Sequence, residues 1–126
     1  MIELEGEELA SLSLGHTDTD NTTCLHVPSI GLVVGGDAAY NDVHVYLGES
    51  SAETRKEWIS ALDIIESLKP CAVVAGHKRS GSEDSPRIVE ETRQAGTLSR
   101  SIEPWSIVEL SAGSKELRVE AFGQLL

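Results

Sequence analysis

Two apolar runs of this sequence end in glycine and are followed directly by a side chain that can bind a metal. Residues 32–36 read Leu-Val-Val-Gly-Gly before Asp37, and residues 72–76 read Ala-Val-Val-Ala-Gly before His77. A continuous apolar run is typical of a strand covered on both faces, and ligand sites of α/β folds gather where such strands end. A loop segment places His16 among hydroxyls and carboxylates. We therefore expect His16, Asp37 and His77 to converge on one metal site.

The sequence around these segments predicts an α/β fold with a mixed sheet. Alternating or continuous apolar residues predict strands at 9–14, 22–27, 30–34 and 71–75. Residues 38–49 have no clear period and are expected to form a loop near the site.

Two helices are expected. The first is capped by Ser50 with Glu53 in a capping box, buries Trp58 in the core, and ends before Pro70. The second runs over residues 85–96, because Ser-Pro starts a helix and Gly tends to end one. A strand, the first helix and another strand in this order form a parallel crossover.

The chain of 126 residues is expected to be a single domain that ends in a β-hairpin. Its hydrophobic content of 40% is enough for a core. Residues 105–110 and 117–122 alternate like two strands around a turn at 111–115, within a divergent tail over 95–126.

The order of three motifs resembles the C-terminal half of a metallo-β-lactamase superfamily hydrolase. These motifs are Gly-His-Thr at 15–17, Gly-Asp at 36–37 and Val-Val-Ala-Gly-His at 73–77, and the resemblance covers residues 5–94. It implies half of an αββα sandwich and a zinc site. It also implies that His16 serves one metal, that Asp37 bridges two, and that His77 serves the second.

Further residues are candidates for supporting roles at this site. Asp18 or Asp20 is expected to orient a ligand histidine. Tyr40, His44 and Lys78 are candidates for the substrate side, although a histidine like His44 is also compatible with a packing or surface role and Lys78 with a solvated one.

The superfamily's first metal motif, His-x-His-x-Asp-His, does not occur in the sequence. The remaining histidines, His26 and His44, lie too far apart to imitate it. A catalytic zinc needs about three protein ligands and an open position, and a two-metal site needs more. We therefore expect a truncated metallo-β-lactamase-like protein with a partial metal site and weak or no hydrolase activity by itself. The alternatives are a zinc hydrolase active as an oligomer or with a separate N-terminal partner, and a non-catalytic interaction protein.

The composition of the chain, and the N-terminal half of the superfamily fold that it is expected to lack, lead to predictions about its partners and its location in the cell. The 10 Lys and Arg against 21 Asp and Glu give a net charge of −11, which disfavours nucleic acid and membrane surfaces. No signal segment is visible, and Cys24 and Cys71 are expected to be reduced core residues, so a cytoplasmic protein is predicted. An uncovered sheet face is expected to associate, and a homodimer is the predicted result.

Overall fold

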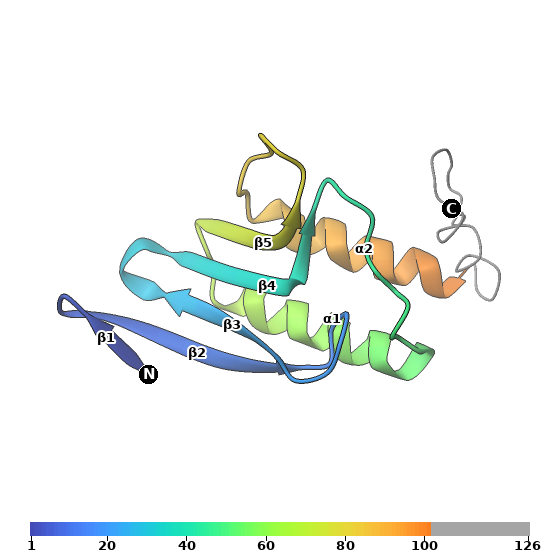
Figure 1. Ribbon diagram of the computed structural model, residues 1–126, viewed down its shortest axis with the longest axis horizontal. Coiled ribbons are helices and arrows are strands. Elements are labelled where there is room, and N and C mark those ends of the chain that lie inside the picture. The colour runs from blue at the N-terminus through green and yellow to red at the C-terminus, as the bar shows by residue number, and fades with distance from the viewer. Residues whose placement is uncertain (102–126) are drawn as a thin grey trace. The chain divides into compact units, whose positions relative to one another are not determined.

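A five-stranded mixed sheet forms the centre of the compact unit Met1–Arg93. The computed structural model describes residues 1–101 (Figure 1). The strands lie in the order β1-β2-β3-β4-β5, with β4 and β5 parallel and the other neighbours antiparallel. Their bounds are Ile2–Leu4, Glu7–Gly15, Thr22–Val27, Leu32–Asn41 and Ala72–Lys78. The predicted mixed α/β sheet and its parallel crossover are confirmed.

In the part of the chain that the structure describes, three helical segments connect these strands or follow them. They are the short 3₁₀ helix η1 (Pro28–Ile30), the crossover helix α1 (Ala52–Ser67) and helix α2 (Arg87–Ser101). The predicted cap of α1 was one residue too early: Ser51 is the cap, and its capping box uses the Thr54 hydroxyl rather than a Glu53 carboxylate. Helix α2 continues through Gly96 instead of ending there, since an interior glycine costs only about 1 kcal/mol relative to alanine.

Strand β4 contains a bulge between Gly36 and Tyr40. The sequence instead predicted a loop at 38–49. Gly36 pairs with Ala75 and Tyr40 pairs with His77, so residues 37–39 of β4 lie opposite Gly76 alone. Gly36 starts this β4 bulge with a positive φ of 57°. The loop prediction was therefore wrong for residues 38–41, which extend the strand beyond the apolar run.

Side chains from both helices hold the β4 bulge. The indole Nε1 of Trp58, in α1, donates a hydrogen bond of 2.9 Å to the carbonyl of Ala38. The backbone N–H of Tyr40 donates to Thr92 Oγ1, in α2, at 3.1 Å. These bonds satisfy backbone groups that the bulge removes from the strand ladder. Trp58 is buried, as predicted.

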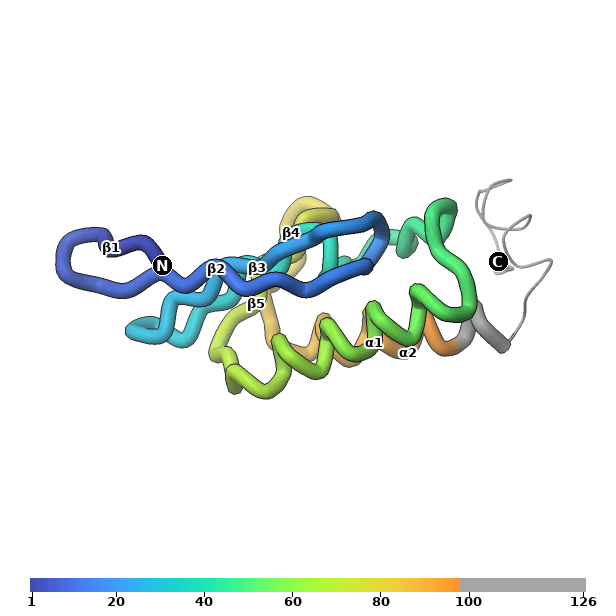
Figure 2. The backbone as a smooth tube through the Cα atoms, turned by 90° about the horizontal axis from the view of Figure 1, so that it is seen from below, coloured from blue at the N-terminus to red at the C-terminus, as the bar shows by residue number. Residues whose placement is uncertain are grey.

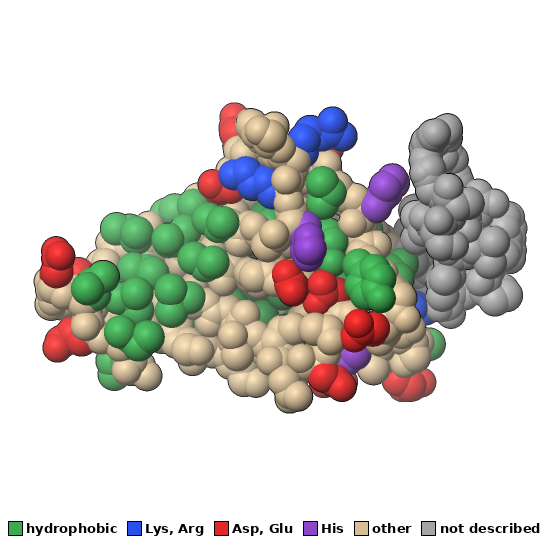
Figure 3. All heavy atoms as spheres, viewed as in Figure 1, with side chains coloured by type: hydrophobic (Ala, Val, Ile, Leu, Met, Phe, Trp, Pro, Cys, Tyr) green, Lys and Arg blue, Asp and Glu red, His purple; other side chains and the backbone are tan. Residues whose placement is uncertain are grey.

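Among the described residues, one face of the sheet is covered by helix and the other is not. Figure 2 shows α1 along one side of the sheet, and on that side Cys24, Val33 and Val73 are buried. Their sequence neighbours on the opposite face are half-buried or exposed, and Figure 3 shows hydrophobic side chains gathered there. This uncovered face comprises Ile2, Leu9, Leu25, Val27, Leu32, Val34 and Val74, which pair across the strands.

The predictions for the two cysteines and for the C-terminal hairpin have different outcomes. Cys24 is buried, but Cys71 is exposed, because it lies just before β5 rather than within the strand, and both are free thiols. The predicted hairpin at 105–110 and 117–122 lies outside the described residues. The second compact unit begins at Gln94, and only the end of α2 is described in it. Among residues 1–101, neither helix combines the length and the apolar content that a membrane-crossing helix needs.

Replacing Trp58 by phenylalanine tests the support of the β4 bulge. Trp58→Phe keeps an aromatic ring but leaves the buried Ala38 carbonyl without its donor, so the free energy of unfolding should fall by about 1–3 kcal/mol. Urea unfolding followed by circular dichroism measures this. The control is Ile64→Ala on the same helix, whose side chain is 41% exposed, and which should change stability by less than about 0.5 kcal/mol. An equal loss of stability in both variants would contradict the support of the β4 bulge by the Trp58 hydrogen bond.

Candidate metal site

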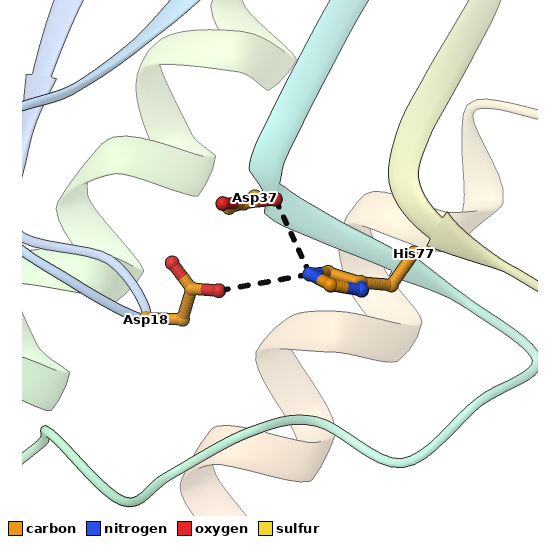
Figure 4. A group of neighbouring side chains, drawn as sticks. All are labelled: Asp18, Asp37 and His77. Atoms are coloured by element: carbon orange, nitrogen blue, oxygen red, sulfur yellow. Dashed lines mark ion pairs between the residues drawn. The ribbon is translucent and has the colours of Figure 1, made fainter.

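Asp18, Asp37 and His77 form the metal-competent cluster among the described residues. One potential ligand atom from each residue lies within 4.8 Å of the other two. The Nε2 atom of His77 is 3.2 Å from Asp37 Oδ1 and 4.0 Å from Asp18 Oδ2. Figure 4 shows the three side chains directed toward one another from the loop after β2, from β4 and from β5. Three segments that are distant in sequence therefore meet at one point.

The β4 bulge and a glycine bring Asp37 and His77 together. Asp37 is the first residue of the bulge, and His77 follows Gly76 in β5. A Cβ on Gly76 would lie 2.7 Å from Asp37 Oδ1, and equally close to the backbone C and O of Gly36. Only glycine allows the two strands to approach this closely without a shift of the backbone.

Tyr40 links Asp18 to His77. Its hydroxyl donates a 2.8 Å hydrogen bond to Asp18 Oδ2, and its ring stacks on the His77 imidazole with 4.7 Å between the centroids. Burial, with the hydrogen bond to Asp18, raises the pKa of the Tyr40 hydroxyl well above its usual range. Tyr40 therefore stays protonated and remains a donor to Asp18 at any physiological pH.

The Asp18 carboxylate is buried and only partly satisfied. It is 5% exposed, and while Tyr40 donates to Oδ2, the buried Oδ1 has no hydrogen-bond partner among residues 1–101. Burial raises the pKa of Asp18; the charge of Asp37 adds to this, and the Tyr40 hydrogen bond and His77 oppose it.

His16 lies in the same loop as Asp18 but is not a member of the cluster. Its Nδ1 is 2.6 Å from Asp20 Oδ1, and its backbone N–H donates to Glu57 Oε2 at 3.2 Å. Its Nε2 is buried and has no partner in the structure described. A ring whose Nδ1 donates to a carboxylate presents the Nε2 lone pair, which is the arrangement of a metal-ligating histidine.

The three substrate-side candidates occupy different positions. Tyr40 is buried within the site. The ammonium of Lys78 is paired with Asp84 Oδ1 at 2.7 Å. His44 is exposed and lines a surface pocket together with Asp42, Val43 and Arg79.

The donor atoms fit a divalent cation. Ligand atoms at about 2.0–2.2 Å from one ion lie at most roughly 4.4 Å apart, so the cluster needs to close by only a few tenths of an ångström. The unpaired Asp18 Oδ1 is a buried acceptor that such an ion would satisfy. The cluster joins Asp37 and His77 as the sequence predicts, and adds Asp18, which the sequence had suggested only as a support for a histidine. The carboxylate that holds the His16 ring is that of Asp20.

The sequence matches no family model and no curated protein. The structure is similar to solved metallo-β-lactamase structures. A metallo-β-lactamase family protein from Thermus thermophilus superposes with a TM-score of 0.64 at 20% identity, over 79% of this chain and 34% of that protein. A metallo-β-lactamase from Pontibacter korlensis superposes with a TM-score of 0.60 at 17% identity, over 76% of this chain and 44% of that one. The chain thus has part of the metallo-β-lactamase fold and spans less than half the length of these proteins.

Replacing Gly76 by alanine tests the close approach of β5 to β4. The added Cβ would collide with the Gly36 backbone, so Gly76→Ala should lower the free energy of unfolding by about 1–3 kcal/mol and move Asp37 away from His77. Urea unfolding and zinc affinity, measured by calorimetry, report the two effects. In the control, Gly96→Ala in α2, the added Cβ meets no atom of the described residues within 4 Å, and the change should be stabilising by up to about 1 kcal/mol. Unchanged zinc affinity in Gly76→Ala would contradict the role given to this glycine.

Proposed function

We propose that this chain provides part of the metal site of a metallo-β-lactamase-like hydrolase, and that by itself it has weak or no hydrolase activity. The observation that carries the proposal is the meeting of Asp37 and His77 at the β4 bulge, within a fold shared with metallo-β-lactamases. The 126 residues contain no His-x-His-x-Asp-His motif, so the ligand set is incomplete. Zinc is the proposed metal.

Each residue of the proposed site has a role that its contacts support. Asp37 and His77 bind one cation, and His16 offers Nε2 to a second, with its ring held by Asp20. When bound, the metal supplies a water of lowered pKa and polarises a carbonyl or phosphoryl oxygen. His44, exposed beside Arg79, is the better supported candidate for a substrate contact, because Tyr40 and Lys78 are engaged within the protein.

Activity assays on the purified chain test this proposal. With zinc added, hydrolysis of nitrocefin, a thioester and bis-p-nitrophenyl phosphate should have kcat/KM far below the roughly 10⁴–10⁸ M⁻¹s⁻¹ of enzymes. Asp37→Ala and His77→Ala should remove whatever metal-dependent turnover remains, whereas Asp63→Ala, on the exposed surface of α1, should not. Turnover in the enzymatic range that Asp37→Ala abolishes would show a complete site in one chain. Turnover that neither site variant changes would contradict a role for this site.

The uncovered face supports a proposal about partners. It carries at least one apolar side chain on each of the strands β1 to β5, and apolar patches mark surfaces where another protein packs. We propose that a second copy of this chain covers it, because an isologous pairing needs only the surface that one chain presents. A separate N-terminal half is the alternative occupant, and a non-catalytic interaction protein is the second candidate function.

The oligomeric state tests the homodimer. Light scattering at micromolar concentration should give a mass twice the 13.5 kDa of one chain. Val34→Lys, in the middle of the uncovered face, should yield a folded monomer because a desolvated ammonium is costly at an apolar interface. Ile64→Lys, at an exposed position on α1, should leave the dimer intact. A monomeric unmodified chain would refute the homodimer and favour the separate half.

We also propose a cytoplasmic location. The support is that both cysteines are free and that Cys71 is exposed, as is usual for proteins kept in a reducing compartment.

A further inference from the structure

Asp18 holds an energetically unfavourable position that the proposed roles of His16, Asp37 and His77 do not explain. Its carboxylate is almost fully buried, and one oxygen accepts no hydrogen bond from the described part of the chain. Buried carboxylates normally have partners for both oxygens, because an unpaired buried charge is costly. An oxygen left without a donor in a cluster of potential ligands indicates that its partner is a cation.

The surroundings of Asp18 favour a cation over a protein partner. The charged groups that face it are the Asp37 carboxylate, which repels it, and His77, whose Nε2 is 4.0 Å away. That distance is too long for a hydrogen bond but suits two ligands of one ion. Tyr40 uses its only donor on Asp18 Oδ2, the same oxygen that lies 4.0 Å from His77 Nε2, so Oδ1 has no partner among the described residues.

We propose that Asp18 is the third protein ligand of a divalent cation held by Asp37 and His77, so that this chain binds one cation without help from another chain. His16 is outside this set, because it is not in the cluster and its Nδ1 is bound to Asp20. This inference rests on the metal site of the proposed function and adds to it a ligand from the loop after β2.

The ligand chemistry determines which cations this site accepts. Two carboxylates and one imidazole, without a thiolate, form an oxygen-rich set. Carboxylates suit manganese and magnesium, whereas imidazole suits zinc and iron, so the set should bind Mn²⁺ as well as Zn²⁺. Mn²⁺ is also the more useful probe, because its electron paramagnetic resonance signal distinguishes bound ion from free ion.

Tyr40 is a positioning residue for this cation. It holds Asp18 through the hydroxyl and His77 through ring stacking, and so fixes the angle between two of the three ligands. Tyr40→Phe keeps the stacking and loses the hydrogen bond. It should therefore weaken binding by roughly 10–100-fold, the usual effect of removing a group that orients a metal ligand.

The test is Mn²⁺ binding to the full chain by electron paramagnetic resonance, with Zn²⁺ calorimetry alongside. The unmodified protein should bind one Mn²⁺ per chain, and Asp18→Asn should raise the Kd by more than the roughly 100-fold upper range for an orienting residue. Glu53→Gln and Asp63→Asn, at exposed positions of α1, are the control variants, and both should change the Mn²⁺ Kd by less than the roughly 10-fold lower range for an orienting residue.

The metal-free variants provide the folding control. Asparagine keeps an acceptor for Tyr40 and removes the repulsion from Asp37, so in EDTA the melting temperature of Asp18→Asn should equal or exceed that of the unmodified chain. A loss of binding in a variant that melts no lower is then a loss of the ligand.

Several results would overturn the inference. They are an unmodified chain that binds no Mn²⁺ at millimolar concentration, an Asp18→Asn variant that binds normally, and a His16→Ala variant that loses the ion. The proposed function can fail separately. If Mn²⁺ binds through Asp18 while Asp37→Ala leaves all hydrolysis unchanged, the cation site stands and the hydrolase role falls.

Discussion

The metal cluster depends on the interruption of one strand. Strand β4 turns at Gly36 and inserts three residues opposite Gly76, and this places the Asp37 carboxylate at the side of His77. The bulge is not self-supporting, because it removes backbone groups from the ladder. A tryptophan from α1 and a threonine from α2 supply the missing hydrogen bonds. The geometry of the site therefore depends on how both helices pack against the sheet.

The burial of Asp18, a candidate metal ligand, lowers the stability of the metal-free folded state. Burying a carboxylate beside another carboxylate disfavours the folded state, and its raised pKa reflects that. Because the folded-state pKa lies above the unfolded one, the contribution of Asp18 to stability is largest below its ordinary pKa and is lost as pH rises through the raised value. A bound cation reverses this balance at neutral pH, since it gives the free oxygen a partner.

Much of the fold follows from local sequence. The strand at 22–27, the crossover helix and the burial of Trp58 depend on periodicity and capping, which neighbouring residues determine. The extension of β4 through Asn41 does not, because hydrogen bonds from residues 20 and 52 positions away stabilise it. The convergence of Asp37 and His77 could be predicted because each follows an apolar run that ends in glycine, although Asp37 lies at a bulge within β4 rather than at the end of the strand. The place of Asp18 could not, because it depends on a hydrogen bond to Tyr40, 22 residues further on.

The location of the bound ion tests the central claim most directly. Crystals of residues 1–126 grown with zinc and measured at the zinc absorption edge would give an anomalous difference peak at the ion. A single strong peak touching Asp18, Asp37 and His77 is the predicted result. A peak on His16 without Asp18, or on the exposed Cys71 thiol, would contradict a cation site built by the β4 bulge and the loop after β2.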